Sequence, residues 1–223
     1  MVARVKHCMN SSPVKIKICG LTRYEDAALA AQLGAWGLGF IFSDKSPRAC
    51  PPGRAREIIL QLDSEGFDVE KVGVFLNESA ETVNRIAADT GITVAQLHGT
   101  EAPEVCNKID IRVLKAIQQL AFEDPQVLDL YHPHWLLMDA PRIGDKWGGT
   151  GHTADWDRAR LIAKEHPLFL AGNLGPDNIV QALDRVRPLG ADLSSSIEAS
   201  HGIKDHDRLR RLFEVLQESG HVS

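Results

Sequence analysis

One thiol stands where a ligand could reach it. The segment Lys17-Ile18-Cys19-Gly20-Leu21-Thr22 is a β-type run that ends on a cysteine and passes through a glycine turn into a helix start. Thr22 and Glu25 have capping-box spacing, which predicts a helix beginning at Arg23. Cys19 is therefore expected at the carboxyl end of a strand, the edge at which parallel α/β proteins bind ligands. A free thiol has an ordinary pKa of about 8.5, so it needs only modest help to be ionised at neutral pH. The alternative is a packed core cysteine.

A carboxyl group ends another apolar run. The alternation of a strand puts Trp135, Leu137 and Asp139 on one face of the run Trp135–Asp139. If that face points into the protein, the carboxyl group lies among apolar neighbours, where it can have a raised pKa and carry a proton at neutral pH. The alternative is a simple cap of the loop that follows.

The elements that must position these groups alternate regularly along the chain. Strands are expected at Val14–Cys19, Trp36–Phe42, Lys71–Asn77, Ile92–His98, Ile111–Ile117, Trp135–Asp139, Leu168–Gly172 and Ala191–Ser195. Helices are expected at Arg23–Leu33, Arg54–Asp63, Ser79–Asp89, Glu101–Lys108, Glu123–Leu130, Asp155–Lys164, Pro176–Val186 and Asp205–Glu218, with Pro176 at the first position of its helix. Eight strand–helix units predict an α/β fold, a single (β/α)8 TIM barrel over residues 14–223 after a short N-terminal extension, residues 1–13. An open doubly wound sheet is the alternative.

Composition excludes several classes of function. The 223 residues are 43% apolar and 25% charged, with a net charge of −5 and no basic cluster, so we expect no nucleic-acid partner. No run approaches the roughly 20 apolar residues of a membrane span, and the first residues lack the apolar region of a signal peptide. The four cysteines form no C-x-x-C pair, which argues against a zinc site or disulfide scaffold and favours a reducing, cytoplasmic location.

Two further pairs of polar side chains belong to predicted strands. Lys17 shares the face of Cys19, and Asp192 should point inward from the eighth strand, which neighbours the first in a closed barrel. The pattern predicts a buried Lys17–Asp192 ion pair beneath the site. Gln96 and His98 end the fourth strand, where His98 could contact a ligand or be a structural imidazole.

Seven groups of residues, in this order along the chain, together resemble the phosphoribosylanthranilate isomerase family of tryptophan biosynthesis. They are Lys17-Ile18-Cys19-Gly20-Leu21-Thr22 with Glu25-Asp26-Ala27; Gly39-Phe40-Ile41-Phe42 with Lys45-Ser46-Pro47-Arg48; Val72-Gly73-Val74-Phe75; Gln96-Leu97-His98-Gly99; Leu136-Leu137-Met138-Asp139-Ala140; Gly148-Gly149-Thr150-Gly151; and Asp192-Leu193-Ser194-Ser195 with Gly202-Ile203-Lys204-Asp205. The resemblance implies an Amadori rearrangement of N-(5-phosphoribosyl)anthranilate to 1-(2-carboxyphenylamino)-1-deoxyribulose 5-phosphate, the third step counted from anthranilate formation. That reaction includes no redox step, so no metal and no organic cofactor are expected.

The resemblance also implies roles for single residues. Cys19 is similar to the family's general base, Asp139 to its general acid, and Arg48 to its clamp on the anthranilate carboxylate, for which a guanidinium fork is suited. The alternative for Arg48 is a solvated loop arginine. The phosphate is expected at main-chain N–H groups of the loops after strands 7 and 8, as in many barrels: Gly172, Asn173, Ser194, Ser195 and Ser196. The expected partner is a phosphorylated small molecule, bound by a monomer or a homodimer.

The chain departs from the family pattern at three positions. Asn173 and Ser196 stand where the family usually has glycine, and His201 stands where it usually has proline. Asn tolerates the left-handed conformation best among the other residues, so the loop at Asn173 is expected to keep its shape.

Two other functions stay open. One is another aminoaldose sugar-phosphate isomerase of the histidine-pathway type, in which an acid would be expected in place of Cys19. The other is a barrel that binds a phosphorylated metabolite without turnover.

Overall fold

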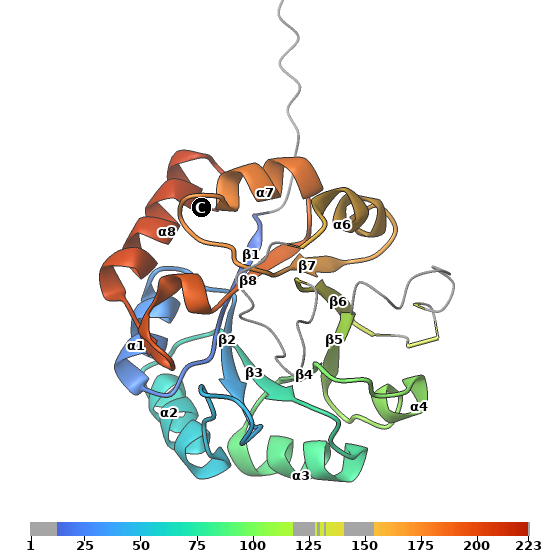
Figure 1. Cartoon of the computed structure of the whole chain (residues 1–223). Coiled ribbons are helices and arrows are strands. Elements are labelled where there is room, and N and C mark those ends of the chain that lie inside the picture. The colour runs from blue at the N-terminus through green and yellow to red at the C-terminus, as the bar shows by residue number, and fades with distance from the viewer. Residues whose placement is uncertain (1–12, 118–127, 129, 132, 141–153, 223) are drawn as a thin grey trace, which may run out of the picture.

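Eight parallel strands close into a barrel in chain order. The computed structural model describes residues 13–117, 128, 130–131, 133–140 and 154–222. The strands are β1 (Lys15–Cys19), β2 (Gly37–Ile41), β3 (Glu70–Phe75), β4 (Val94–Leu97), β5 (Arg112–Ile117), β6 (Trp135–Met138), β7 (Leu168–Leu170) and β8 (Gly190–Leu193). β8 pairs with β1, which closes the sheet (Figure 1). The predicted (β/α)8 barrel is confirmed, and the open doubly wound sheet is excluded.

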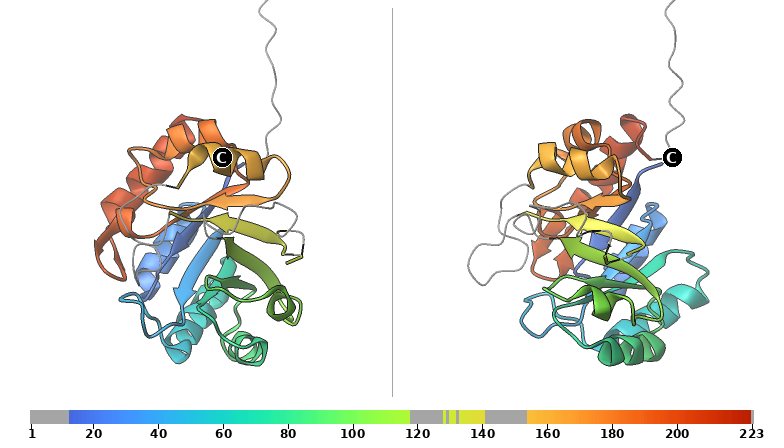
Figure 2. Two further views of the ribbon diagram at one scale, coloured as in Figure 1. Left: turned by 45° about the vertical axis from the view of Figure 1, so that its right-hand side comes forward. Right: turned by 90° about the vertical axis from the view of Figure 1, so that its right-hand side faces the viewer.

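Helices enclose the strands from outside (Figures 1 and 2). They are α1 (Tyr24–Gln32), α2 (Pro52–Ser64), α3 (Ala80–Thr90), α4 (Pro103–Cys106), α6 (Trp156–Ala163), α7 (Ile179–Val186) and α8 (His206–Glu218). The predicted helix Glu123–Leu130 lies outside the described residues except at Leu128 and Leu130, as do the segment Gly148-Gly149-Thr150-Gly151 and the predicted extension before Pro13. Across the part of the chain that is described, no helix has the length and apolar character needed to cross a membrane.

Strand alternation sorts the apolar side chains into two layers. Inward side chains form a small interior cluster: Val72, Val94, Leu114, Ala116, Leu137, Phe169 and Ala171. Outward side chains, such as Leu136 and Met138 of β6, join the larger layer under the helices. Trp36, Trp135 and Phe169 close the amino-terminal end of the barrel, with ring centroids 4.9–6.4 Å apart. The opposite end is left for polar side chains at the carboxyl ends of the strands.

The last helix, α8 (His206–Glu218), packs on the barrel and leads the chain back to the start of β1. Asp205 caps α8 by accepting hydrogen bonds from the N–H groups of Asp207 and Arg208. The buried face of α8 consists of Leu209, Leu212, Phe213 and Leu216. The N–H of Val14 donates to the carbonyl of His221, so the C-terminal end lies beside the start of β1 (Figure 2).

Two local predictions were wrong, and one connection was not predicted. α1 begins at Tyr24, and Thr22 does not cap it, because the Thr22 hydroxyl donates to the carbonyl of Gly202, 2.6 Å away. α7 begins at Ile179, so Pro176 lies in the preceding turn rather than at the first helical position. The connection from β8 to α8 contains a short turn and an antiparallel hairpin that the sequence did not predict: η2 (Ser195–Ile197), β9 (Glu198–Ser200) and β10 (Ile203–Lys204). Thr22 therefore joins the loop after β1 to this hairpin.

Candidate active site

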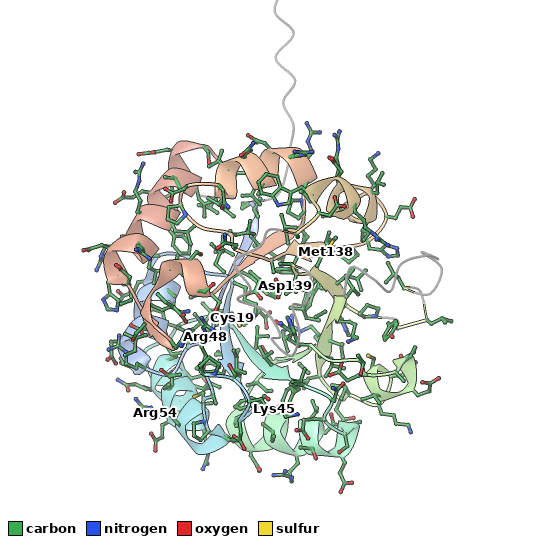
Figure 3. All side chains as sticks on the ribbon, viewed as in Figure 1. Cys19, Lys45, Arg48, Arg54, Met138 and Asp139 are labelled. Carbon is green, nitrogen blue, oxygen red and sulfur yellow. The ribbon has the colours of Figure 1, made fainter. Side chains whose placement is uncertain are left out.

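A cavity of about 720 Å³ opens at the carboxyl ends of the strands. Its lining includes all nine residues predicted for the site: Cys19, Arg48, His98, Asp139, Gly172, Asn173, Ser194, Ser195 and Ser196. Figure 3 shows Cys19, Asp139 and Arg48 gathered over the centre of the barrel, whereas Arg54 lies at its outer rim on α2. Residues that are far apart in the sequence thus meet because barrel closure brings their strand ends together.

Cys19 is the last residue of β1 and is buried, with 6% of its surface exposed. A Cβ atom on Gly39 of β2 would lie 2.9 Å from the Cys19 Sγ and 3.1 Å from the Lys17 Nζ, so glycine is needed beside the thiol. Burial raises the pKa of the Cys19 thiol, and the Lys17 ammonium offsets part of that rise. The thiol therefore needs more help to ionise than an exposed cysteine would.

The predicted Lys17–Asp192 ion pair is confirmed. The two residues are direct partners in the β1–β8 register, and the Lys17 Nζ donates to the Asp192 Oδ1 at 2.8 Å. Burial acts to lower the pKa of Lys17, but attraction to Asp192 and Cys19 outweighs it and raises that pKa. Burial raises the pKa of Asp192, although Lys17 opposes the rise. The pair is held inside the barrel with its charges directly beneath the thiol.

Asp139 follows β6 and faces His98 across the cavity. One carboxylate oxygen, Oδ1, accepts a hydrogen bond from the N–H of Ala140 at 2.7 Å. The other, Oδ2, lies 3.4 Å from the Nε2 of His98. The Nδ1 of His98 lies 2.8 Å from the Nε2 of Gln96, so Gln96, His98 and Asp139 form a chain of polar contacts from β4 to β6. This arrangement fixes the direction in which the Asp139 carboxyl group points.

Arg48 is held by a carboxylate that sequence reasoning missed. The Nε of Arg48 donates to both Glu198 oxygens at 2.9 Å, and a terminal nitrogen lies 2.8 Å from Oε2. Lys204, which is also buried, donates to the Glu198 Oε1 at 3.0 Å. Burial would raise the pKa of Glu198, but the two cations lower it. The guanidinium of Arg48 is thereby positioned at the cavity, with part of its fork already engaged.

The loops after β7 and β8 form one wall of the cavity. Asn173 has φ 51°, the left-handed conformation predicted for it, and Gly172 has φ 93°. A Cβ atom on Gly172 would lie 2.9 Å from the N of Ala140, so this glycine also permits a close approach. The Ser196 hydroxyl donates to the carbonyl of Leu174, which joins the two loops and engages the extra hydroxyl that the sequence supplies.

The remaining polar side chains of the cavity indicate which ligands it can bind. His201, the third departure from the family pattern, lines the same cavity. Within the described residues, no group of three or more His, Cys, Asp or Glu side chains is arranged to hold a metal ion. The polar side chains that line the cavity include the Cys19 thiol, the carboxyl groups of Asp139 and Asp192, the imidazoles of His98 and His201, the Arg48 guanidinium and the Lys45 ammonium. Together they can move protons and bind anions.

Comparison with known proteins gives one consistent result. A family model described as N-(5'phosphoribosyl)anthranilate (PRA) isomerase matches residues 16–215. An N-(5'-phosphoribosyl)anthranilate isomerase from Syntrophus aciditrophicus is 41% identical over 204 residues, which cover 91% of this chain and 87% of that protein.

Solved structures agree with the sequence comparison. The crystal structure of phosphoribosyl anthranilate isomerase from Thermus thermophilus is 36% identical with a TM-score of 0.82, and the match covers 92% of this chain and 99% of that one. Another is a phosphoribosyl anthranilate isomerase in complex with reduced 1-(o-carboxyphenylamino)-1-deoxyribulose 5-phosphate. It is 33% identical with a TM-score of 0.76, over 92% of this chain and 99% of that one.

Proposed function

This chain belongs to the N-(5'-phosphoribosyl)anthranilate isomerase family, and we propose that it isomerises this aminoaldose to the aminoketose by cofactor-free acid–base catalysis. Family membership makes it an isomerase of tryptophan biosynthesis. The proposal includes the substrate named above and its product, 1-(2-carboxyphenylamino)-1-deoxyribulose 5-phosphate. It also includes the place of the step, which is the third counted from anthranilate formation. The observation that supports it is the meeting of a thiol and a carboxyl group, at the ends of β1 and β6, in one cavity that Arg48 and the loops after β7 and β8 also line.

The chemistry asks for one acid and one base. A proton delivered to the ring oxygen lets the bond between that oxygen and C1 break, while the nitrogen lone pair forms a C1–N double bond. A base then removes the proton on C2. The released electron pair forms a C1–C2 double bond, and the nitrogen recovers its lone pair. The resulting enol tautomerises to the ketone, so atoms and charge balance without an oxidant or reductant.

We assign the acid to Asp139 and the base to Cys19. The main-chain N–H of Ala140 and the imidazole of His98 orient the Asp139 carboxyl group toward the cavity. Lys17 stabilises the thiolate form of Cys19 against the cost of burial, which supports proton removal by that group. Because the two groups come from β1 and β6, they are suited to act on opposite sides of a bound sugar.

Two binding elements complete the assignment. The Arg48 guanidinium, braced by Glu198, is proposed to bind the anthranilate carboxylate through its remaining N–H groups. The phosphate is proposed to lie between Gly172-Asn173 and Ser194-Ser195-Ser196. Neither of these loops contains Lys or Arg, so main-chain amides would supply the donors. The partner of the chain is then a phosphorylated small molecule. A cytoplasmic location and a monomeric or homodimeric state stay predictions.

The proposal is tested by turnover of N-(5-phosphoribosyl)anthranilate by the purified chain, followed by chromatography of substrate and product. Conversion is expected, at a rate that a chelator leaves unchanged. Growth of a tryptophan auxotroph that lacks the isomerase provides the cellular arm, with the Cys19→Ser chain as its matched control. Binding of the product analogue without turnover would identify a binding barrel instead, and turnover of a histidine-pathway aminoaldose alone would identify the other isomerase class.

A further inference from the structure

One polar atom in the cavity has no partner in the protein. Gln96, on β4, is 1% exposed and lines the cavity. Its Nε2 contacts the Nδ1 of His98, but its Oε1 is buried and makes no hydrogen bond within the described part of the chain. Rotating the amide by 180° would exchange its two ends and still leave one polar atom unpartnered. A buried polar group without a partner is costly, because folding removes its water without replacing it.

The bonded end of the same amide has a separate consequence. With the Gln96 N–H as donor, the Nδ1 of His98 must accept, so the imidazole proton resides on Nε2. That nitrogen faces the Oδ2 of Asp139 at 3.4 Å. The orientation of the Gln96 amide therefore decides whether the His98 Nε2, which faces the proposed acid, carries a proton.

We propose that Gln96 is a substrate-binding residue whose Oε1 accepts a hydrogen bond from a hydroxyl or secondary amine group of the bound phosphosugar, while its Nε2 holds His98 as the Nε2–H tautomer. The inference rests on the proposed function, since a sugar that carries an amino substituent supplies both kinds of donor. Bound substrate completes the hydrogen bonding of the amide and fixes it in the orientation that keeps the His98 N–H directed at Asp139.

The first measurement compares binding and turnover in two variants. Gln96→Met keeps the approximate length of the side chain but removes both polar ends, and Gln61→Met makes the same change on the exposed surface of α2. In Gln96→Met, the Kd for reduced 1-(o-carboxyphenylamino)-1-deoxyribulose 5-phosphate and the KM are expected to rise about 10-fold, as for loss of one buried hydrogen bond. In Gln61→Met both should match wild type. An unchanged Kd and KM in folded Gln96→Met would overturn the inference while leaving the proposed function intact.

The second measurement reads the tautomer directly in the ligand-free protein. Nitrogen-15 chemical shifts of His98 are expected to report the Nε2–H form in wild type. In Gln96→Glu the ionised side chain can only accept, so the Nδ1–H form or the imidazolium should replace it. An Nδ1–H tautomer in wild type, or shifts that are the same in wild type and Gln96→Glu, would contradict the contact with His98.

The third measurement needs no variant and covers the case in which Gln96→Met does not fold. A crystal structure of wild type with the reduced product analogue should have a ligand donor within about 3.2 Å of the Gln96 Oε1. A ligand bound in the cavity with Oε1 bonded to water alone would overturn the inference. Wild type that neither binds the analogue nor turns over substrate would instead overturn the proposed function, a different pattern of results.

Discussion

Lys17–Asp192 lies inside the barrel and Lys115–Glu101 lies outside it, and these two buried ion pairs differ in how fully their polar atoms are bonded. The N–O distances are alike, 2.8 and 2.7 Å. The Nζ of Lys115 also donates to the carbonyls of Leu97 and Gly99. The Lys17 Nζ instead lies between Asp192 and the Cys19 thiol, and Asp192 borders the cavity.

The carboxylates of the two pairs differ in the hydrogen bonds they accept from main-chain N–H groups. Glu101 accepts hydrogen bonds from the N–H groups of Asn77 and Gly99 in addition to Lys115. Burial would raise the pKa of Glu101, but Lys115 and the main-chain N–H of Asn77 lower it. For Asp192, burial prevails and the pKa is raised. The outer pair is therefore a completed structural contact, whereas the inner pair retains electrostatic influence over the thiol.

The largest expected effect is on stability, at the outer pair. Lys115→Met should lower the free energy of unfolding by about 3–5 kcal/mol, because it leaves the buried Glu101 carboxylate without its cation. Urea unfolding would measure the loss, with exposed Lys108→Met as the control. The kcat per folded molecule should stay near wild type. A large fall in kcat at full folding would place this pair in the catalytic machinery and remove the contrast.

The next effect is on turnover, at the two groups proposed to move protons. Cys19→Ser and Asp139→Asn should each lower kcat at least ~10²-fold, the usual contribution of a positioned acid or base. The control is Cys106→Ser, since burial raises the pKa of that outer thiol to about 11 and it is not among the cavity residues. Steady-state kinetics with matched folding would check the set. Near-normal kcat in either site variant would exclude that residue from the mechanism.

A smaller effect is expected for substrate binding at the rim. Arg48→Ala should raise KM by a factor that corresponds to about 2 kcal/mol of binding free energy, and should change kcat little. The reason is that a carboxylate contact remote from the reacting carbons stabilises the bound substrate and the transition state about equally. Arg54→Ala on the outer face of α2 is the matched control (Figure 3). Equal KM in the two variants would return Arg48 to a purely structural role with Glu198.

The smallest effect distinguishes the pairs by the sign of their pH dependence. The lowered pKa of Glu101 gives stability that is present above the unfolded-state pKa, about 4.3, and is lost as pH falls through the folded value. The raised pKa of Asp192 has the opposite sign, with stability lost as pH rises through the folded value. Glu101→Gln should therefore flatten the acid limb of an unfolding curve, and Asp192→Asn should not. The reverse order of slopes would refute the pKa assignments.

The sequence predicted the parts of this comparison that depend on local pattern. Alternation within β1 and β6 put Lys17, Cys19 and Asp139 on the inner face, and the closed barrel then required Asp192 to meet Lys17. Motifs at strand ends predicted the residues that line the cavity. These predictions succeeded because strand period and barrel closure determine direction without any knowledge of loop geometry.

The remainder depends on loops that meet only after folding. Glu198 holds Arg48 although the two residues are 150 positions apart in the sequence. Glu198 lies in the β9–β10 hairpin, whose strands are too short for the sequence pattern to predict. Glu101 was expected only as the first residue of a helix, but it precedes α4 and is buried against Lys115 and the turn at Asn77. Thr22 likewise matched a helix cap but bonds Gly202 instead. Charged and hydroxyl side chains are adaptable, so their partners follow from tertiary geometry.

The most direct test of the different roles of the two pairs is kcat of the double variant Lys17→Met/Asp192→Leu, measured beside its unfolding free energy. Replacing both buried charges by apolar groups should keep stability within about 1 kcal/mol of wild type. Loss of the Lys17 charge should raise the pKa of Cys19, because its effect on the thiol exceeds the opposing one of Asp192. We expect kcat to fall at least ~10-fold, the equivalent of one pKa unit. A folded double variant with wild-type kcat would contradict the account and make the inner pair structural, like the outer one.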